Sequence, residues 1–476
     1  MDSRATVLGV GRSVNRRVFV AGAAAAAAAF ALGGCSTTEE NSQPASDDEA
    51  NAVAPSMEAN AGGDEDVTLL NEVEYPVEVP SDDADEHAAI ADENPLDDEF
   101  VAGLAMFAED VACYGISQTE PAEGQPNTCL SPAGLYLSLA LLAQGATGNT
   151  QAQLLDALGM ADASTLAAQC GNLMRALWAY TTPGDDPSPS VLQLATSIWA
   201  LSEAPVQKTF LEVATNDFYA ETYDVASAGP VAERMMGTWI ADHSGSTLKP
   251  QIALASDWVM SLINTVWFKD GWLNAFNEND TASGTFHAAA GDVTCDFMTQ
   301  VCERPVVVTD AYTVASLPLT TGATVTFVLP AEGGDPRALL ARATGNSAIF
   351  NLDGDDAQRA RITYTIPKVS FNADASLETV LSSMGVTDIF AEGAELGGIS
   401  EAPLCVSSIE QGTHVAMNEM GVDASSYTRI DMVATALMPD ELEDVSFVLD
   451  RPFVFRITAP NGVVLFVGIV GDPTQS

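Results

Sequence analysis

The chain has 476 residues, of which 47% are hydrophobic, and 66 acidic against 18 basic side chains give it a formal net charge of -48. The hydrophobic content is ample for a large buried core. The negative charge excludes proteins that bind nucleic acid, heparin-like polymers or anionic membranes through a basic surface, because those partners would be repelled.

The first 35 residues have the layout of a bacterial export signal. Arg16-Arg17 resembles a twin-arginine motif, an alanine-rich apolar run follows, and Leu32-Gly33-Gly34-Cys35 resembles a lipobox. The apolar run is too short for a membrane-spanning helix. We therefore predict lipidation at Cys35, contact with the membrane only through that lipid, and a location at the bacterial cell surface or outside the cell. Twin-arginine and general secretory export both remain open.

The next segment, residues 36–96, has the composition of a flexible acidic tether. Residues 36–99 contain 21 acidic side chains and no basic one. A flexible chain of about 60 residues spans roughly 40 Å. The run Val67–Val79 is more apolar, and its structure is left open, because it either packs on the following domain or stays in the tether. We assign residues 97–476 to the folded domain.

Candidate catalytic and metal-binding groups are scarce along the whole sequence. The chain has four histidines and contains no nucleophile elbow, zinc-protease helix, phosphate loop or dinucleotide fingerprint. His287 with Cys295 and Cys302 matches no common zinc spacing. We therefore predict no enzyme activity, no metal and no cofactor. The cysteines other than Cys35 lie far apart and are expected to be mostly isolated thiols, with a bridge between Cys295 and Cys302 left open.

Two early segments of the domain have clear local signatures. Ser131-Pro132 has the residues of a helix N-cap and first turn, with leucines at 135, 139 and 142 along one face. The apolar run from Leu262 to Phe268 reads as a strand that enters a turn at Gly271, and Trp272 reads as a core aromatic. Both readings describe ordinary core elements.

The C-terminal part contains a segment with the period of a strand inside a loop context. Thr413–Met417 reads as a strand, and Gly421 follows as a hinge. From Val422 to Met438 every second residue is small, hydroxylic or apolar. The three charged side chains, Asp423, Arg429 and Asp431, fall on the other phase. A one-residue shift in register would bury all three charges. The segment therefore reads as a loop able to become a strand with one buried face.

The order of these motifs resembles the serpin family. The resemblance covers roughly residues 97–476 and implies one α+β domain with three β-sheets, eight or nine helices and an exposed reactive loop. It is carried by the hinge strand and loop described above and by five further blocks: Asn127–Thr150, Leu262–Phe276, Ile366–Ser400, Asp450-Arg451-Pro452-Phe453 and Leu465–Gly468.

The resemblance implies a suicide inhibitor of serine proteases, and sometimes of cysteine proteases, that traps its target by inserting the cleaved loop into the central sheet. It also implies a region where that sheet opens, which falls on Ser131, Asn264, Trp272 and Gln411. Gly134 stands where the family has a second serine, and Gln411 where a histidine is common. These departures put the family's usual hydrogen-bond set in doubt, although glutamine can both donate and accept.

The resemblance also places the loop's functional positions. Counting from the hinge puts the reactive bond at Thr435–Ala436, with Leu437 and Met438 as alternatives. Small and apolar residues there favour an elastase-like, subtilisin-like or chymotrypsin-like protease as the partner of a monomeric inhibitor. A noninhibitory serpin acting as a binding or storage protein remains the alternative. The hinge residues on this reading are Glu419, Gly421, Val422, Ala424, Ser426 and Thr428.

Overall fold

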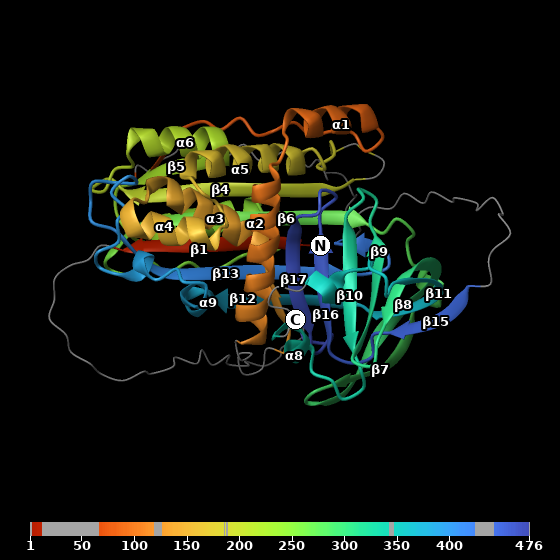
Figure 1. The fold of residues 1–476 in the computed structure, drawn as a ribbon. Coiled ribbons are helices and arrows are strands. Elements are labelled where there is room, and N and C mark those ends of the chain that lie inside the picture. Colours follow the sequence, from red (N-terminus) through yellow and green to blue (C-terminus); the bar gives the residue numbers. More distant parts are fainter. Residues whose placement is uncertain are drawn as a thin grey trace, which may run out of the picture.

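The computed structural model describes residues 2–11, 66–118, 126–184, 186, 189–341, 347–423 and 442–475. Within these ranges the chain forms nine α-helices and seventeen strands in one α+β arrangement, as the sequence predicts. Figure 1 shows a long sheet covered by helices, with the second group of strands packed beside it.

The first sheet has eight strands, and its order places an N-terminal strand, β1, beside β13, which comes about 400 residues later in the chain. Its central strands are β6 and β13, and β1 lies between them (Figure 1). From one edge to the other the strands are β2 (Val67–Leu69), β5 (Ala220–Val225), β4 (Val191–Leu201), β6 (Trp258–Gly271), β14 (Gly421–Val422) with β1 (Asp2–Gly11), β13 (Cys405–Met417) and β12 (Val369–Ser376).

The remaining nine strands form two groups that one long strand joins. The strand β8 pairs with β11 along Phe297–Val306 and with β9 at Val306–Val308. The described residues therefore form two sheets where the sequence analysis expects three, because β8 joins the strands of the second and third into one. One group contains β7 (Ala282–Ala288), β8 (Gly291–Val308), β11 (Gln358–Pro367) and β15 (Glu443–Val448); the other contains β9 (Tyr312–Pro318), β10 (Thr324–Pro330), β16 (Phe453–Thr458), β17 (Val464–Val470) and β3 (Thr128–Leu130).

The helices cover both faces of the first sheet. α3 is buried on every side except at Gln144 and contacts β6 and β17, so it fills the space between the sheets. On the opposite face, Trp239 and Ile240 of α7 form a second core with Trp199 and Ile263. The helices are α1 (Ala84–Glu93), α2 (Asp98–Asp110), α3 (Pro132–Gly145), α4 (Gly148–Ala157), α5 (Ala163–Trp178), α6 (Lys208–Phe218), α7 (Pro230–Asp242), α8 (Pro336–Ala341) and α9 (Glu378–Ser383).

Residues 66–96, which the sequence assigns to the flexible tether, are packed against the domain. β2 extends the sheet by pairing with β5, Tyr75 stacks on Trp178 with ring centroids 5.0 Å apart, and Val79 is buried. α1 follows these contacts. The packed part therefore begins near residue 66 rather than at 97, and we call residues 66–96 the arm.

Within the described ranges, one helical segment is long and apolar enough to cross a membrane. It is α2 together with the π-helix that continues it to Ser117. Half of the segment is buried in the domain, including Phe100, Phe107 and Ile116. Core packing therefore accounts for its composition.

Candidate functional site

The centre of the first sheet holds a position for one strand between β6 and β13, which we call the slot. β1 occupies it and is antiparallel to both neighbours. Its middle residue, Thr6, lies opposite Asn264 on β6 and Gln411 on β13. Figure 1 shows β1, in red, between these two strands. β6 and β13 are thus separated by one strand width, because they pair with β1 and not with each other.

The hinge segment, Asn418–Asp423, begins to enter the same slot. Its short strand β14 places Val422 opposite Met417 of β13 and Asp270 of β6. Two positions further along the slot, opposite Val415 and Phe268, stands Asp2 of β1. β14 and β1 therefore share one register, in which residue 424 of a continued strand would take the place of Asp2.

Gly421 is required by the close approach of two backbones at this entrance. A Cβ at position 421 would lie 2.7 Å from Cα of Gly271. Beyond it, Asp423 has φ 57°, in the left-handed region. The chain therefore leaves the strand conformation directly after Val422.

Trp272 holds the hinge segment through two hydrogen bonds. The indole Nε1 of Trp272 donates to the carbonyl of Asn418 at 2.8 Å, and the backbone N–H of Trp272 donates to the carbonyl of Met420 at 3.0 Å. Trp272 is 3% exposed, so both bonds are shielded from water. The aromatic therefore combines its core position with a direct contact to the hinge.

Glu419 has the strongest polar contacts of the hinge. Lys368 Nζ lies 2.9 Å from one of its carboxylate oxygens, and Thr281 Oγ1 donates at 2.9 Å. Burial alone would raise the pKa of Glu419, but the hydrogen bonds from Lys368, the backbone and Thr281 outweigh it and lower the pKa below its usual value. The carboxylate is therefore charged and fixes the start of the loop to β11–β12.

Asp270 is a buried acid beside the same entrance. Its carboxylate accepts hydrogen bonds from the hydroxyls of Thr320 and Thr321, and its backbone pairs with Val422. Desolvation raises the pKa of Asp270 to about 6 in spite of these hydrogen bonds. Nothing in the sequence pattern singled out this residue apart from its being one carboxylate in an apolar strand.

Below the slot, Gln411 joins β13 to the start of α3. Its Oε1 accepts from the backbone N–H of Ser131 at 2.6 Å, and its Nε2 donates to the carbonyl of Ser131 at 3.1 Å. The hydroxyl of Ser131 donates to Leu465 at 2.9 Å and caps α3 by accepting from Gly134 at 3.1 Å. The glutamine therefore both donates and accepts, as its chemistry allows.

Asn264 lies on the other side of the slot and faces β4. Its amide Nδ2 donates to the carbonyl of Ala195 and to the hydroxyl of Thr196, both at 3.1 Å. A Cβ at Gly134 would lie 2.9 Å from Oδ1 of Asn264, so the glycine leaves room for the asparagine. Asn264 and Gln411 therefore flank Thr6 but bond to different elements.

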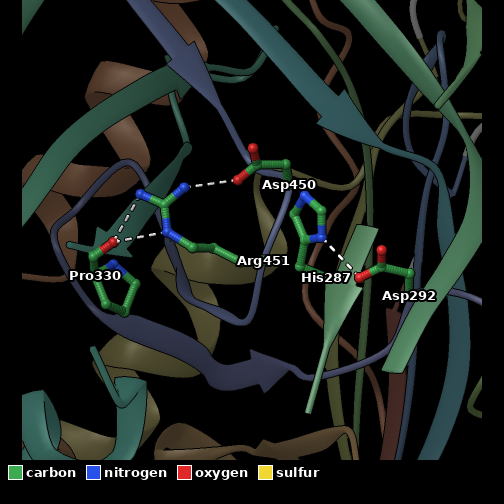
Figure 2. A network of polar contacts seen from close by, with 5 residues as sticks. All are labelled: His287, Asp292, Pro330, Asp450 and Arg451. Atoms are coloured by element: carbon green, nitrogen blue, oxygen red, sulfur yellow. Dashed lines mark hydrogen bonds and ion pairs between the residues drawn. The ribbon is translucent and has the colours of Figure 1, made fainter. Parts of the chain in front are cut away.

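The C-terminal side of the loop has its own anchor, shown in Figure 2. Arg451 donates through Nε and Nη2 to the carbonyl of Pro330, at 3.1 and 3.0 Å, and its Nη1 lies 2.7 Å from Asp450 Oδ1. The backbone N–H of His287 donates to the carbonyl of Asp450 at 2.7 Å. Asp292 accepts from the His287 ring, and this hydrogen bond raises the pKa of His287.

The structure brings Ser131, Asn264 and Gln411 together around the slot, and Trp272 together with the hinge. Several predicted positions lie outside the described residues: Cys35, Ala424, Ser426, Thr428, Thr435, Ala436, Leu437 and Met438. Sequence reasoning did not find Asp270, nor did it place Asp2–Gly11 in the slot.

The cysteines and potential metal ligands add no second site to the described part of the chain. No disulfide joins its six cysteines, including Cys295 and Cys302. No group of three or more histidine, cysteine, aspartate and glutamate side chains is close enough there to hold a metal ion.

Residues 108–473 match the family described as serpin, serine protease inhibitor. Among similar sequences, the putative serpin-Z6C of Oryza sativa is 27% identical over 381 residues, covering 73% of this chain and 91% of the rice protein. The alpha-1-antiproteinase of Rattus norvegicus is 27% identical over 393 residues, covering 81% and 92%.

Solved structures with the same fold include the thermophilic serpin tengpin in its native state, with TM-score 0.69, 19% identity and coverage of 86% of this chain and 100% of tengpin. Arabidopsis AtSerpin1 in its native stressed conformation has TM-score 0.65 and 23% identity, with coverage of 78% and 97%. At these identities the likeness concerns the fold alone.

Proposed function

Because this chain belongs to the serpin family, we propose that it is a suicide inhibitor of serine proteases, with cysteine proteases as a second target class. A lipid on Cys35 would hold it at the bacterial surface, with residues 36–65 as spacer. Membership of the family supports protease inhibition in general.

The observation that carries this proposal is the shared register of β14 and β1. The hinge segment already occupies the first two positions of the slot, and β1 occupies ten positions between the same two strands, beginning at the position of residue 424. A loop freed at one end could therefore take the place of β1 and continue the strand without any change in the pairing of Val422.

The proposed reaction begins with attack of the protease nucleophile on the carbonyl carbon of Thr435. The bond between that carbon and the nitrogen of Ala436 breaks, the amine leaves with a proton, and an ester or thioester joins Thr435 to the enzyme. Residues from 424 onward then enter the slot and carry the enzyme along the sheet. Distortion of its active site stops water from completing the reaction.

The driving force for insertion is large compared with the stability of a domain. About twelve inserted residues gain ladder hydrogen bonds worth roughly 1 kcal/mol each. Burial of the apolar side chains on the inward phase adds a few kcal/mol more. Since whole domains are stable by only about 5–15 kcal/mol, the uninserted protein is held kinetically, and the hinge contacts of Glu419 and Trp272 are well placed to hold it.

The loop sequence favours proteases that cleave after small or apolar residues. Residues 433–438 read Val-Ala-Thr-Ala-Leu-Met. Arg429 is too near the hinge to allow a full-length insertion after cleavage beside it. Elastase-like, subtilisin-like and chymotrypsin-like enzymes are therefore the proposed targets.

A denaturing gel tests the proposal. Incubation with an elastase-like or subtilisin-like protease should give a covalent complex that survives boiling in detergent. Protein nicked in the loop should also melt far above intact protein, because the cut segment becomes a central strand. Cleavage without any complex would refute inhibition and favour the noninhibitory alternative. The hinge departs from the threonine and alanines of the common inhibitory pattern at Val422, Ser425, Ser426 and Tyr427.

A further inference from the structure

We propose that the N-terminal export leader acts as a latch: before it is removed, Asp2–Gly11 fills the slot and keeps the reactive loop out. Cleavage at Cys35 would then remove the leader and open the slot in one event. The inference rests on the proposed function for its consequence, whereas occupation of the slot is tested separately below.

The first support is the extent of the pairing. All ten residues of β1 pair with β13 on one side and with β6 on the other. A strand with neighbours on both sides satisfies its backbone donors and acceptors more completely than an edge strand does. The leader segment is thus a full central strand of the sheet.

The second support is that the leader and the loop compete for the same positions. In the shared register Asp2 stands where residue 424 would stand, and Gly9 stands where residue 431 would stand. The hinge leaves the strand conformation at Asp423, directly before the first of these positions. Only one of the two segments can occupy the slot at a time.

The third support is the match between the two sequences in that register. Thr6, Leu8 and Val10 lie opposite Asn264, Leu262 and Met260 of β6. The loop would place Thr428, Ile430 and Met432 at these same positions. Hydroxyl therefore replaces hydroxyl, and a branched or long apolar residue replaces another, along the half of the slot remote from the hinge.

The half near the hinge is less well matched, and this makes the latch releasable. The register places Asp2 and Arg4 opposite Phe268 and Val266, both of which are buried. The loop carries alanine and serine at these two positions. Charged residue types suit positions between buried neighbours less well than alanine and serine do, so this half of the register favours the loop sequence over the leader sequence. Once cut from the domain, it is held by its pairing alone and is expected to dissociate.

The position of the export motif fits this order of events. Arg16-Arg17 follows Gly11 by only a few residues, and the predicted cleavage site at Cys35 lies beyond the apolar run. Removal of the leader therefore takes the whole latch strand with it.

The test compares full-length chains that keep their leader through a Cys35→Ser change. Thr6→Pro removes a backbone donor from the middle of the latch strand, where a central strand does not tolerate proline. Ser46→Pro makes the same change between the leader and the arm and serves as the control. A chain beginning at residue 36 represents the processed protein, and thermal unfolding checks that each form is folded.

Hydrogen exchange of the amides in 260–268 and 406–415 reads the slot directly. We expect these amides to exchange at least about tenfold faster in the Thr6→Pro chain and in the chain beginning at residue 36 than in the parent and the Ser46→Pro control. The rate of complex formation with an elastase-like protease should rise by at least about tenfold in the same two forms, because inhibition scales with the open fraction.

The two hypotheses fail in different ways. Equal exchange in the Thr6→Pro chain and its parent would overturn the latch, even if the processed protein inhibits. If the chain beginning at residue 36 forms no complex while the exchange difference is present, the proposed inhibition is refuted and the latch stands.

Discussion

Gln411 and Ser131 are joined by two hydrogen bonds of opposite direction, one from the Ser131 N–H at 2.6 Å and one to the Ser131 carbonyl at 3.1 Å. The pair connects the strand on one side of the slot to the first turn of the helix below it. Any movement of β13 away from β6 must stretch or carry these bonds, so the side chain links opening of the sheet to α3.

Replacing Gln411 by alanine should destabilise the uncleaved protein by about 2 kcal/mol, because a buried N–H and a buried carbonyl lose their partner. Chemical denaturation measures the change. Gln358→Ala, at an exposed position on β11, is the matched control and should have little effect. Equal stability of the two variants would show that the bonds do not hold β13 to α3.

Glu419→Gln should lower the free energy of unfolding by about 2 kcal/mol, because it removes a charged hydrogen bond to Lys368. The lowered pKa of Glu419 means that its contribution is present above the unfolded value near 4.5 and is lost as the pH falls through the lower folded value. Unfolding measured from pH 3 to 7 should show this difference at neutral pH and a smaller one in acid. Glu410→Gln, exposed on β13, should follow the parent.

Asp270 should give the opposite pH dependence. Its folded pKa of about 6 lies above the unfolded value of 3.8, so folding favours the protonated acid and stability is lost as the pH rises from about 4 to about 6. Compared with Asp270→Asn, the parent should lose up to about 3 kcal/mol across this window. Asp355→Asn, an exposed change, should run parallel to the parent. Identical pH profiles for Asp270→Asn and the parent would mean that the acid is not buried in the folded protein.

Ser426→Arg should convert an inhibitor into a substrate. In the register of β14 and β1, position 426 lies opposite Val266 and Thr413, which are both buried. An unpaired guanidinium there costs several kcal/mol, so the yield of covalent complex should fall to about a tenth or less while cleavage continues. Gels with an elastase-like protease give both quantities.

Ser425→Arg is the control for register, because the same side chain then falls on the other phase, opposite Trp267 and His414. It should keep most of the complex. If Ser425→Arg abolishes the complex and Ser426→Arg does not, the register is wrong by one residue.

Tyr75→Ala should lower the stability of the domain by about 2 kcal/mol. The ring stacks on Trp178 and its hydroxyl donates to Glu221 at 3.2 Å. Val77→Ala changes a side chain that is 67% exposed and should stay within about 0.5 kcal/mol of the parent. Equal melting temperatures would show that the arm does not contribute to the domain.

The fold class and family could be predicted from the sequence because they depend on motifs whose order is specific. The helix that starts at Ser131 and the strand that ends at Gly271 each have a local signature, and both are confirmed. The arm could not be placed in this way. It is held by single residues such as Tyr75 and Val79, which have no period and gain their meaning only from the surface they meet.

The site was less accessible to sequence reasoning than the fold. Asp270 is one carboxylate among 66 acidic residues, and only its burial beside the hinge sets it apart. Asp2–Gly11 contains small and β-branched residues, yet it reads as part of an export signal. Its strand is defined by pairing with β6 on one side and β13 on the other, which no local pattern in the segment reveals.

The two ends of the loop are attached to the domain in different ways, the first through the strand β14 and the second through Arg451. This difference determines which end a single cut would release. The residues before the cut lead back to a strand position that can simply be extended, whereas those after it lead to Arg451, whose guanidinium grips the Pro330 carbonyl with two bonds. In the proposed reaction, scission would therefore free the first segment to extend the strand and leave the second held at Arg451. A protease bonded to the first segment would be carried along the sheet, whereas the second segment would keep its place.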